Sequence, residues 1–133
     1  MKRSDANRIE RLSWDDVEAS CLELCEMIVR PVSMVMPVAR GGLVPAAIIA
    51  YRLNLPIAGV ITPGGFLSSR SPEILVVDDI SDSGVTFRRV REAFPNAVYV
   101  APYAKPLGAS LCDHYAVGLA SDVWAEFAWS PGD

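Results

Sequence analysis

The apolar residues of this chain fall into two patterns, helical spacing and short continuous runs. Apolar positions three and four residues apart predict a first helix that begins after the N-cap Ser13 and stops at Pro31. Its expected core face consists of Trp14, Val17, Cys21, Leu24, Cys25 and Ile28. Two further helices are expected at residues 43–53 and 84–94. Continuous aliphatic runs predict buried strands at residues 33–38, 55–61, 73–79, 96–104 and 115–119.

Strands therefore alternate with helices along most of the chain. This order predicts an α/β fold with a mostly parallel, twisted sheet covered by helices on both faces. Residues 1–12 are polar and are expected to be loosely ordered, and residues 62–72 form the one long loop. The helix at 84–94 is rich in arginine. Its solvated or subunit-facing side is expected to carry Arg88, Arg89 and Arg91.

The composition limits the classes of function. The 133 residues, of which 51% are hydrophobic, predict one domain covering residues 1–133 with a well-filled core. The net charge of −4 argues against a nucleic-acid partner, because phosphate binding normally requires a basic protein. No apolar run approaches the roughly 18 residues that span a bilayer, so we expect a cytoplasmic protein with no membrane partner. The three cysteines and the single histidine have no metal-binding spacing, which predicts reduced thiols.

The most informative stretch is EILVVDDISDSGVTF, residues 73–87. Asp78 and Asp79 end a buried run, at the strand edge where open α/β folds bind ligands. Their carboxylates can hold a hard divalent cation and accept hydrogen bonds from sugar hydroxyls. A turn of small residues then enters a helix, where hydroxyls and backbone N–H groups can cradle a phosphate. This turn consists of Ser81, Asp82, Ser83, Gly84, Val85 and Thr86. The alternative is an Asx-type turn and helix cap with solvated carboxylates.

A second turn of interest follows the first predicted strand and contains Arg40, Gly41 and Gly42. Glycines let the backbone approach a ligand closely, and a guanidinium can grip a phosphate or pyrophosphate with two hydrogen bonds. A helix start with a solvated arginine would explain the same residues. The position of this turn favours the ligand-binding interpretation, since the turn and residues 73–87 should lie at the same edge of the sheet.

The sequence VVDDISDSG resembles the phosphoribosyl-pyrophosphate (PRPP) motif of the type I phosphoribosyltransferases. The resemblance extends from Ser13 to Trp129 and is strongest to the xanthine-guanine and hypoxanthine (6-oxopurine) enzymes. It implies the α/β fold of that family with a small hood, and a homo-oligomer, usually a dimer or tetramer. It also implies Mg²⁺ as cofactor, held by Asp79 and Asp78. A non-proline cis peptide bond at residues 39–40 is a further implication.

The resemblance also implies a base site. In the family, the lysine of an Ala-Lys-Pro sequence such as that of Lys105 contacts the purine 6-oxygen. The chemistry agrees, because an ammonium group only donates hydrogen bonds and suits a 6-oxopurine better than adenine. An aromatic residue at the position of Trp124 covers the base, and Asp82 corresponds to the general base. An exposed Lys105 and a packing role for Trp124 are the alternatives, while Phe127 and Trp129 are expected to pack within the hood.

The sequence departs from the family pattern in three places. The loop at 62–72 is short and contains Ser68, Ser69 and Arg70 but no tyrosine, so its ability to exclude water from the reaction is in question. Ser83 replaces the usual threonine and keeps the hydroxyl. Ala128 replaces a proline that often precedes the last tryptophan.

The leading hypothesis is a purine salvage enzyme that transfers 5-phosphoribose from PRPP to xanthine, guanine or hypoxanthine and releases pyrophosphate. A PRPP- or nucleotide-binding regulatory protein without turnover is the second hypothesis, which the short loop supports. An enzyme for a pyrimidine or for adenine is a third, against which Lys105 and Trp124 argue. An interaction scaffold is a fourth, and it leaves the carboxylates unexplained.

Overall fold

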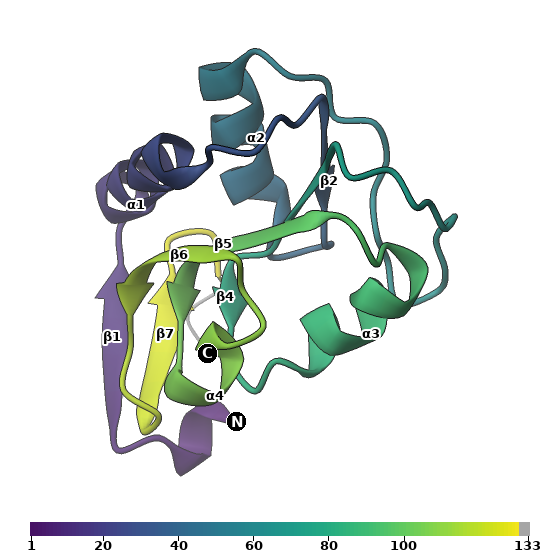
Figure 1. Ribbon diagram of the computed structural model, residues 1–133. Helices are drawn as coiled ribbons and strands as arrows, with labels where there is room; N and C mark the ends of the chain where they lie inside the picture. The colour runs from purple at the N-terminus through teal and green to yellow at the C-terminus, as the bar shows by residue number, and fades with distance from the viewer. Residues whose placement is uncertain (131–133) are drawn as a thin grey trace.

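A computed structural model describes residues 1–130 and has an α/β fold, as the sequence predicted (Figure 1). Residues 131–133, the end of the predicted domain, lie outside the described residues. Among residues 1–130, no helix is long and apolar enough to cross a membrane. The elements in chain order are η1 (Arg3–Asp5), β1 (Arg8–Leu12), α1 (Trp14–Met27), β2 (Met34–Pro37), α2 (Leu43–Leu53), β3 (Ile74–Val77), β4 (Ile80–Ser81), α3 (Val85–Ala93), β5 (Val98–Ala104), α4 (Pro106–Ala109), β6 (His114–Gly118) and β7 (Val123–Phe127).

The central sheet has five strands, all in parallel pairs. β2 pairs with β3, and β3 pairs with β5. β4 and β6 both pair with Tyr103 and Ala104 of β5, so they lie on opposite edges of β5. β3 and β6 both pair with Val100, so β3 lies on the same edge as β4. β3 and β4 are therefore two parts of one strand line, and Asp78 and Asp79 interrupt it.

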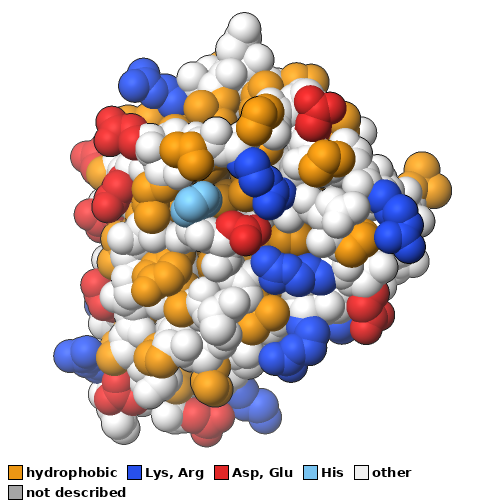
Figure 2. Space-filling view, viewed as in Figure 1, with side chains coloured by type: hydrophobic (Ala, Val, Ile, Leu, Met, Phe, Trp, Pro, Cys, Tyr) orange, Lys and Arg blue, Asp and Glu red, His pale blue; other side chains and the backbone are white. Residues whose placement is uncertain are grey.

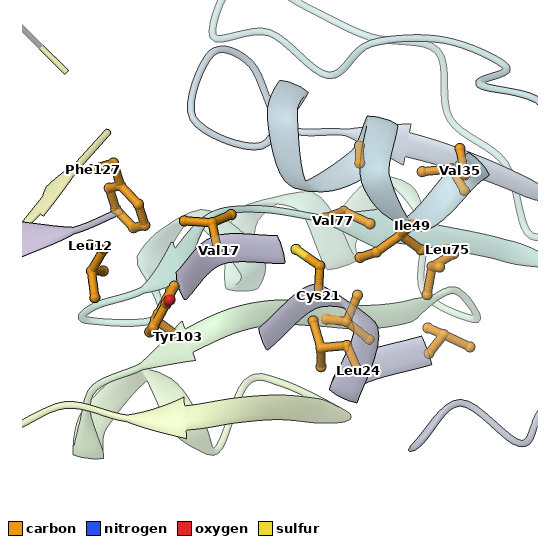
Figure 3. Packing of buried hydrophobic residues seen from close by; sticks show 14 of the residues in the cluster. Leu12, Val17, Cys21, Leu24, Val35, Ile49, Leu75, Val77, Tyr103 and Phe127 are labelled. Carbon is orange, nitrogen blue, oxygen red and sulfur yellow. The ribbon is translucent and has the colours of Figure 1, made fainter. Parts of the chain in front are cut away.

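The side chains of β3 alternate between two hydrophobic clusters, one on each face of the sheet. Leu75 and Val77 pack with α1 and α2, whereas Ile74 and Val76 pack with α3. Figure 1 shows α1 and α2 on one side of β5 and α3 on the other. Figure 3 shows side chains of the first cluster, among them Cys21, converging on the sheet. Burial on both faces explains the continuous aliphatic run that predicted this strand.

The amino-terminal segment is more ordered than predicted. Residues 8–12 form β1, which pairs in parallel with β7 as a separate two-stranded sheet. This sheet, β1 with β7, is the hood that the resemblance implied. The prediction of a loosely ordered residue 1–12 segment was wrong because its pairing partner lies more than a hundred residues away, where no local pattern reveals it.

Two further element predictions need correction. Residues 55–61 form no strand but run beside β2, with isolated bridges at Ile57 and Ile61. Pro56 lacks an N–H donor, which favours an edge position with incomplete pairing. α1 ends at Met27, before the expected stop at Pro31, although the capping box at Ser13 is present. Trp14 is 55% exposed and lies outside the core face that the spacing predicted.

Candidate active site

The acid pair lies at the break between β3 and β4, at the carboxyl end of the buried strand. The backbone N–H of Asp79 donates to Asp78 Oδ1 (2.8 Å), and the N–H of Ile80 donates to Asp79 Oδ1 (2.7 Å). Burial, and next the charge of Asp79, raise the pKa of Asp78 well above its usual value. Burial also raises the pKa of Asp79, against hydrogen bonds that lower it. Without a cation, the pair therefore resists full ionisation.

These two carboxylates have the donor chemistry that suits a hard divalent cation. Mg²⁺ is usually held by one or two carboxylates, with water and substrate phosphates as the remaining ligands. Neither carboxylate forms an ion pair with any side chain in residues 1–130. The described chain also contains no group of three or more His, Cys, Asp or Glu side chains suited to a metal. A cation at this pair would therefore depend on a bound ligand and water for its other oxygen atoms.

The arginine–glycine turn meets the acid pair directly. The Ala39–Arg40 peptide bond is cis, as the resemblance implied. A Cβ atom at Gly41 would collide with the Asp79 carboxylate, and one at Gly42 would lie 2.7 Å from the carbonyl oxygen of Val38. Only glycine fits at such close approaches. Arg40 itself is exposed. The two turns that the sequence singled out are therefore joined at one edge of the sheet.

The turn between β4 and α3 surrounds a small cavity of about 80 Å³, which Asp82, Ser83, Gly84, Val85 and Thr86 line together with Ile80, Ser81 and Phe87. Gly84 has a φ angle of 88°, a backbone conformation that glycine adopts without strain. The Ser83 hydroxyl accepts a hydrogen bond from the Val85 N–H at 3.4 Å. The buried Ser81 hydroxyl instead donates to the Gly108 carbonyl at 2.8 Å, so this hydroxyl supports the turn from behind.

Asp82 connects this cavity to Lys105, at the end of β5. Lys105 Nζ lies 3.5 Å from Asp82 Oδ1, and the Lys105 side chain is only 4% exposed. Lys105 is thus a buried ammonium and not the exposed strand-end lysine that was the alternative. Met1, which the sequence did not single out, lies beside this pair, with its Sδ 3.2 Å from Lys105 Nζ.

Trp124 lies in β7 of the hood, opposite Ile9 of β1, and is partly buried. No aromatic stacking of its ring occurs within residues 1–130, and no hydrogen bond joins it to Asp82 or Lys105 there. Phe127 and Trp129 behave as predicted for packing residues, because their rings stack at 4.7 Å. The structure therefore places Trp124 on the hood, in the strand that pairs with β1.

Three residues beyond the predicted set shape this region. Gly108 has no room for a side chain, because a Cβ there would collide with the Ser81 carbonyl. Arg89, on the second turn of α3, lines a cavity beside Asp78. Arg91 was expected on a solvated or subunit-facing side; it is partly buried within the chain, stacks over the Tyr99 ring at 4.2 Å and pairs with Asp113. The sequence carried a weak signal for Gly108 only, as a glycine close after the Lys-Pro pair.

No family model matches the chain. The chain is 36% identical over 135 residues to the xanthine-guanine phosphoribosyltransferase of Chromohalobacter salexigens, covering 91% of this chain and 83% of that protein. It is 35% identical to the enzyme of the same name from Vibrio atlanticus, covering 89% and 86%. These relatives are matched over most of their length.

Solved structures agree on the fold. The purine phosphoribosyltransferase of Pyrococcus horikoshii matches with a TM-score of 0.77 at 25% identity, over 94% of this chain and 95% of that chain. A hypothetical protein from Neisseria gonorrhoeae with bound ppGpp matches with a TM-score of 0.70 at 19% identity, over 96% and 92%. Since sequence identity and fold agree along nearly the whole chain, the chain belongs to the xanthine-guanine phosphoribosyltransferase family.

Proposed function

We propose that this protein transfers 5-phosphoribose from PRPP to a 6-oxopurine base, namely xanthine, guanine or hypoxanthine, in purine salvage. The observation that carries this proposal is the position of Asp82. It lines the small cavity at the start of α3, and it also lies 3.5 Å from the buried Lys105 ammonium. A single carboxylate therefore stands between a phosphate cradle and a group that can read a base.

The phosphate end of the substrate fits the turn before α3. Ser83, Gly84, Val85 and Thr86 would hold the 5-phosphate through hydroxyl and backbone N–H groups, in the small cavity that they line. Arg40 and the amides of Gly41 and Gly42 would hold the pyrophosphate. The contact between Gly41 and Asp79 supports this arrangement, because it joins the pyrophosphate turn to the carboxylates that would hold Mg²⁺ and the ribose hydroxyls.

The base end would be read by Lys105 and covered by Trp124. In the described chain the Lys105 ammonium faces Asp82 and the Met1 sulfur. A thioether is a weak hydrogen-bond acceptor, so a purine 6-oxygen would be the better partner and would replace the Met1 side chain. A buried ammonium has no acceptor function to offer, which favours a carbonyl over the amino group of adenine.

In the proposed reaction, the bond between ribose C1 and the pyrophosphate oxygen breaks, and a bond between C1 and a purine nitrogen forms. Asp82 accepts the proton that the purine loses at N7, and pyrophosphate leaves with the electron pair of the broken bond. Positive charge develops on the ribose in the transition state, where Asp78 and Asp79 would stabilise it by position. When bound at these carboxylates, Mg²⁺ would neutralise charge on the pyrophosphate.

The test is pyrophosphate release from PRPP and Mg²⁺, with guanine, xanthine, hypoxanthine, adenine and uracil supplied separately. Product with 6-oxopurines alone is the expected result. Product with adenine or uracil at a comparable kcat/KM would refute the assignment of Lys105 as the group that selects the base. We further propose that the enzyme acts in the cytoplasm as a homo-oligomer. Light scattering of the purified protein would check the oligomeric state.

A regulatory protein that binds PRPP or a nucleotide without turnover is the second candidate. It is supported by the short 62–72 loop, whose ability to exclude water from the reaction is in question and which lies against α3. The Phe66 ring contacts Phe94 at 5.7 Å, and the Ser69 N–H donates to the Ala93 carbonyl at 3.0 Å. The fold neighbour with bound ppGpp is consistent with nucleotide binding. PRPP binding by calorimetry, with no product from any of the five bases, would favour this candidate.

A further inference from the structure

A second cavity, of about 220 Å³, lies beside the acid pair, between α3 and the loop at 62–72. It is smaller than the roughly 300 Å³ at which pockets for drug-sized ligands begin, so it suits a small group and not a whole nucleotide. Ala39 of the pyrophosphate turn and Asp78 form one wall. Thr86 and Arg89 of α3 form another, and Thr62 and Phe66 of the loop contribute to the third.

Among the described residues, Arg89 is the one cationic side chain on this lining. It is exposed, and within residues 1–130 it forms neither an ion pair nor a hydrogen bond through its side chain. Arg89 lies three residues after Thr86, on the same face of α3. Arg88, its neighbour, is equally exposed but does not line the cavity. Figure 2 shows Lys and Arg side chains gathered on the face over α3.

The charges of the proposed site call for such a cation. PRPP is strongly anionic, yet the site brings together the carboxylates of Asp78, Asp79 and Asp82. Lys105 is already paired with Asp82, which leaves Arg40 as the predicted site cation without an ion pair among residues 1–130. A planar guanidinium that faces the cavity beside Ala39 and Asp78 can donate two parallel hydrogen bonds to a phosphate group.

We propose that Arg89 binds the pyrophosphate group of PRPP and of the released product, as a second guanidinium opposite Arg40. This inference rests on the proposed function and adds a ligand contact that the motif at 78–86 does not contain. The 62–72 loop, which forms the third wall of the cavity, supports this proposal, because it is held against the carboxyl end of α3. The Ser69 N–H donates to the carbonyl of Ala93, the last residue of α3, at 3.0 Å, and this bond holds the loop whose Thr62 and Phe66 line the cavity.

The test compares Arg89→Gln with Arg88→Gln, a matched control that removes the same charge from the next residue of the same helix. Calorimetry measures the Kd of Mg²⁺-PRPP and of inorganic pyrophosphate, and steady-state kinetics measures the KM for PRPP and for the base. We expect R89Q to weaken pyrophosphate and PRPP binding by about tenfold or more, in line with a charged hydrogen bond. R88Q should stay within about twofold of the wild type. Arg89→Lys should keep part of the affinity for pyrophosphate, since lysine keeps the positive charge but lacks the planar guanidinium that donates two parallel hydrogen bonds.

The outcomes separate the two proposals. If wild-type protein binds PRPP and R89Q binds pyrophosphate as tightly as R88Q does, the role of Arg89 is refuted and the proposed function stands. An equal rise of the KM for the base and for PRPP in R89Q would indicate general damage to the site and also overturn the assignment. If the wild type binds neither PRPP nor pyrophosphate, both proposals fail. Equal Tm values for the two variants would show that folding does not cause the difference.

Discussion

Replacing Gly41 by alanine tests whether the pyrophosphate turn and the acid pair form one site. The added Cβ would lie 2.6 Å from Cγ and 2.8 Å from Oδ1 of Asp79, while ordinary contacts of a Cβ begin at 3.4 Å. The shortfall against Cγ is therefore 3.4 − 2.6 = 0.8 Å. Either the turn must shift or the Asp79 carboxylate must rotate away.

Each way of relieving this collision has a cost that can be worked out. Shifting a packed backbone costs about 1–3 kcal/mol, as for other overpacked positions. Rotating Asp79 breaks the 2.7 Å hydrogen bond that its Oδ1 accepts from the Ile80 N–H, which is worth about 1.5–3 kcal/mol for a charged acceptor. We therefore expect the free energy of unfolding to fall by about 1–3 kcal/mol. For a domain of this size, each kcal/mol lowers the Tm by about 3–5 °C.

The assay combines thermal unfolding with PRPP binding in the presence of Mg²⁺. Gly64→Ala is the matched control, because its nearest atom outside neighbouring residues, Thr62 Oγ1, is 3.9 Å from the added Cβ. G64A should change the free energy of unfolding by no more than about 0.5 kcal/mol and leave PRPP binding unchanged. G41A should lower the Tm and weaken PRPP binding by about tenfold or more, since both relief routes displace proposed ligand groups. Tm and Kd values for G41A equal to those of G64A would refute the reasoning.

Four other outcomes are expected. Asp82→Asn should slow the chemical step by about 10²- to 10⁴-fold without weakening PRPP binding, and single-turnover kinetics at the wild-type rate would contradict the general-base role. Lys105→Ala should raise the KM for the base, whereas Lys2→Ala, at the other lysine, should not. In EDTA at pH 7, Asp78→Asn should raise the Tm. The folded pKa of Asp78 is raised, so its carboxyl favours folding below its usual pKa, near 3.8, and loses that contribution as pH rises through the folded pKa. The difference in Tm between variant and wild type should therefore vanish toward pH 4. Burial raises the pKa of Cys21 from 9.0 to about 12, so the folded protein contains roughly a thousandfold less Cys21 thiolate than it would with the usual pKa. Iodoacetamide should therefore label Cys21 far more slowly in folded than in urea-unfolded protein.

Local patterns were sufficient for much of the fold. Ile74–Val77 could be identified as a buried strand because each of its side chains is apolar and both faces are covered. The capping box at Ser13 and the helix end at Asn54, which has a φ of 56°, were also readable from residue type. Prediction failed where pairing is non-local, as for β1 with β7. It also failed at residues 55–61, where an apolar run only borders the sheet.

The sequence by itself determined the α/β class and the two turns that we propose as ligand-binding, because a doubly buried strand followed by small polar residues is a local signal. Only the tertiary structure decided that Gly41 touches Asp79, that Lys105 is buried beside Asp82, and that Arg89 lines a cavity next to Asp78. The first two contacts join segments that are distant in the chain, and the cavity beside Asp78 also needs Ala39 and Thr62. They depend on strand order and on the way α3 packs against the sheet, which residue spacing along the chain does not encode.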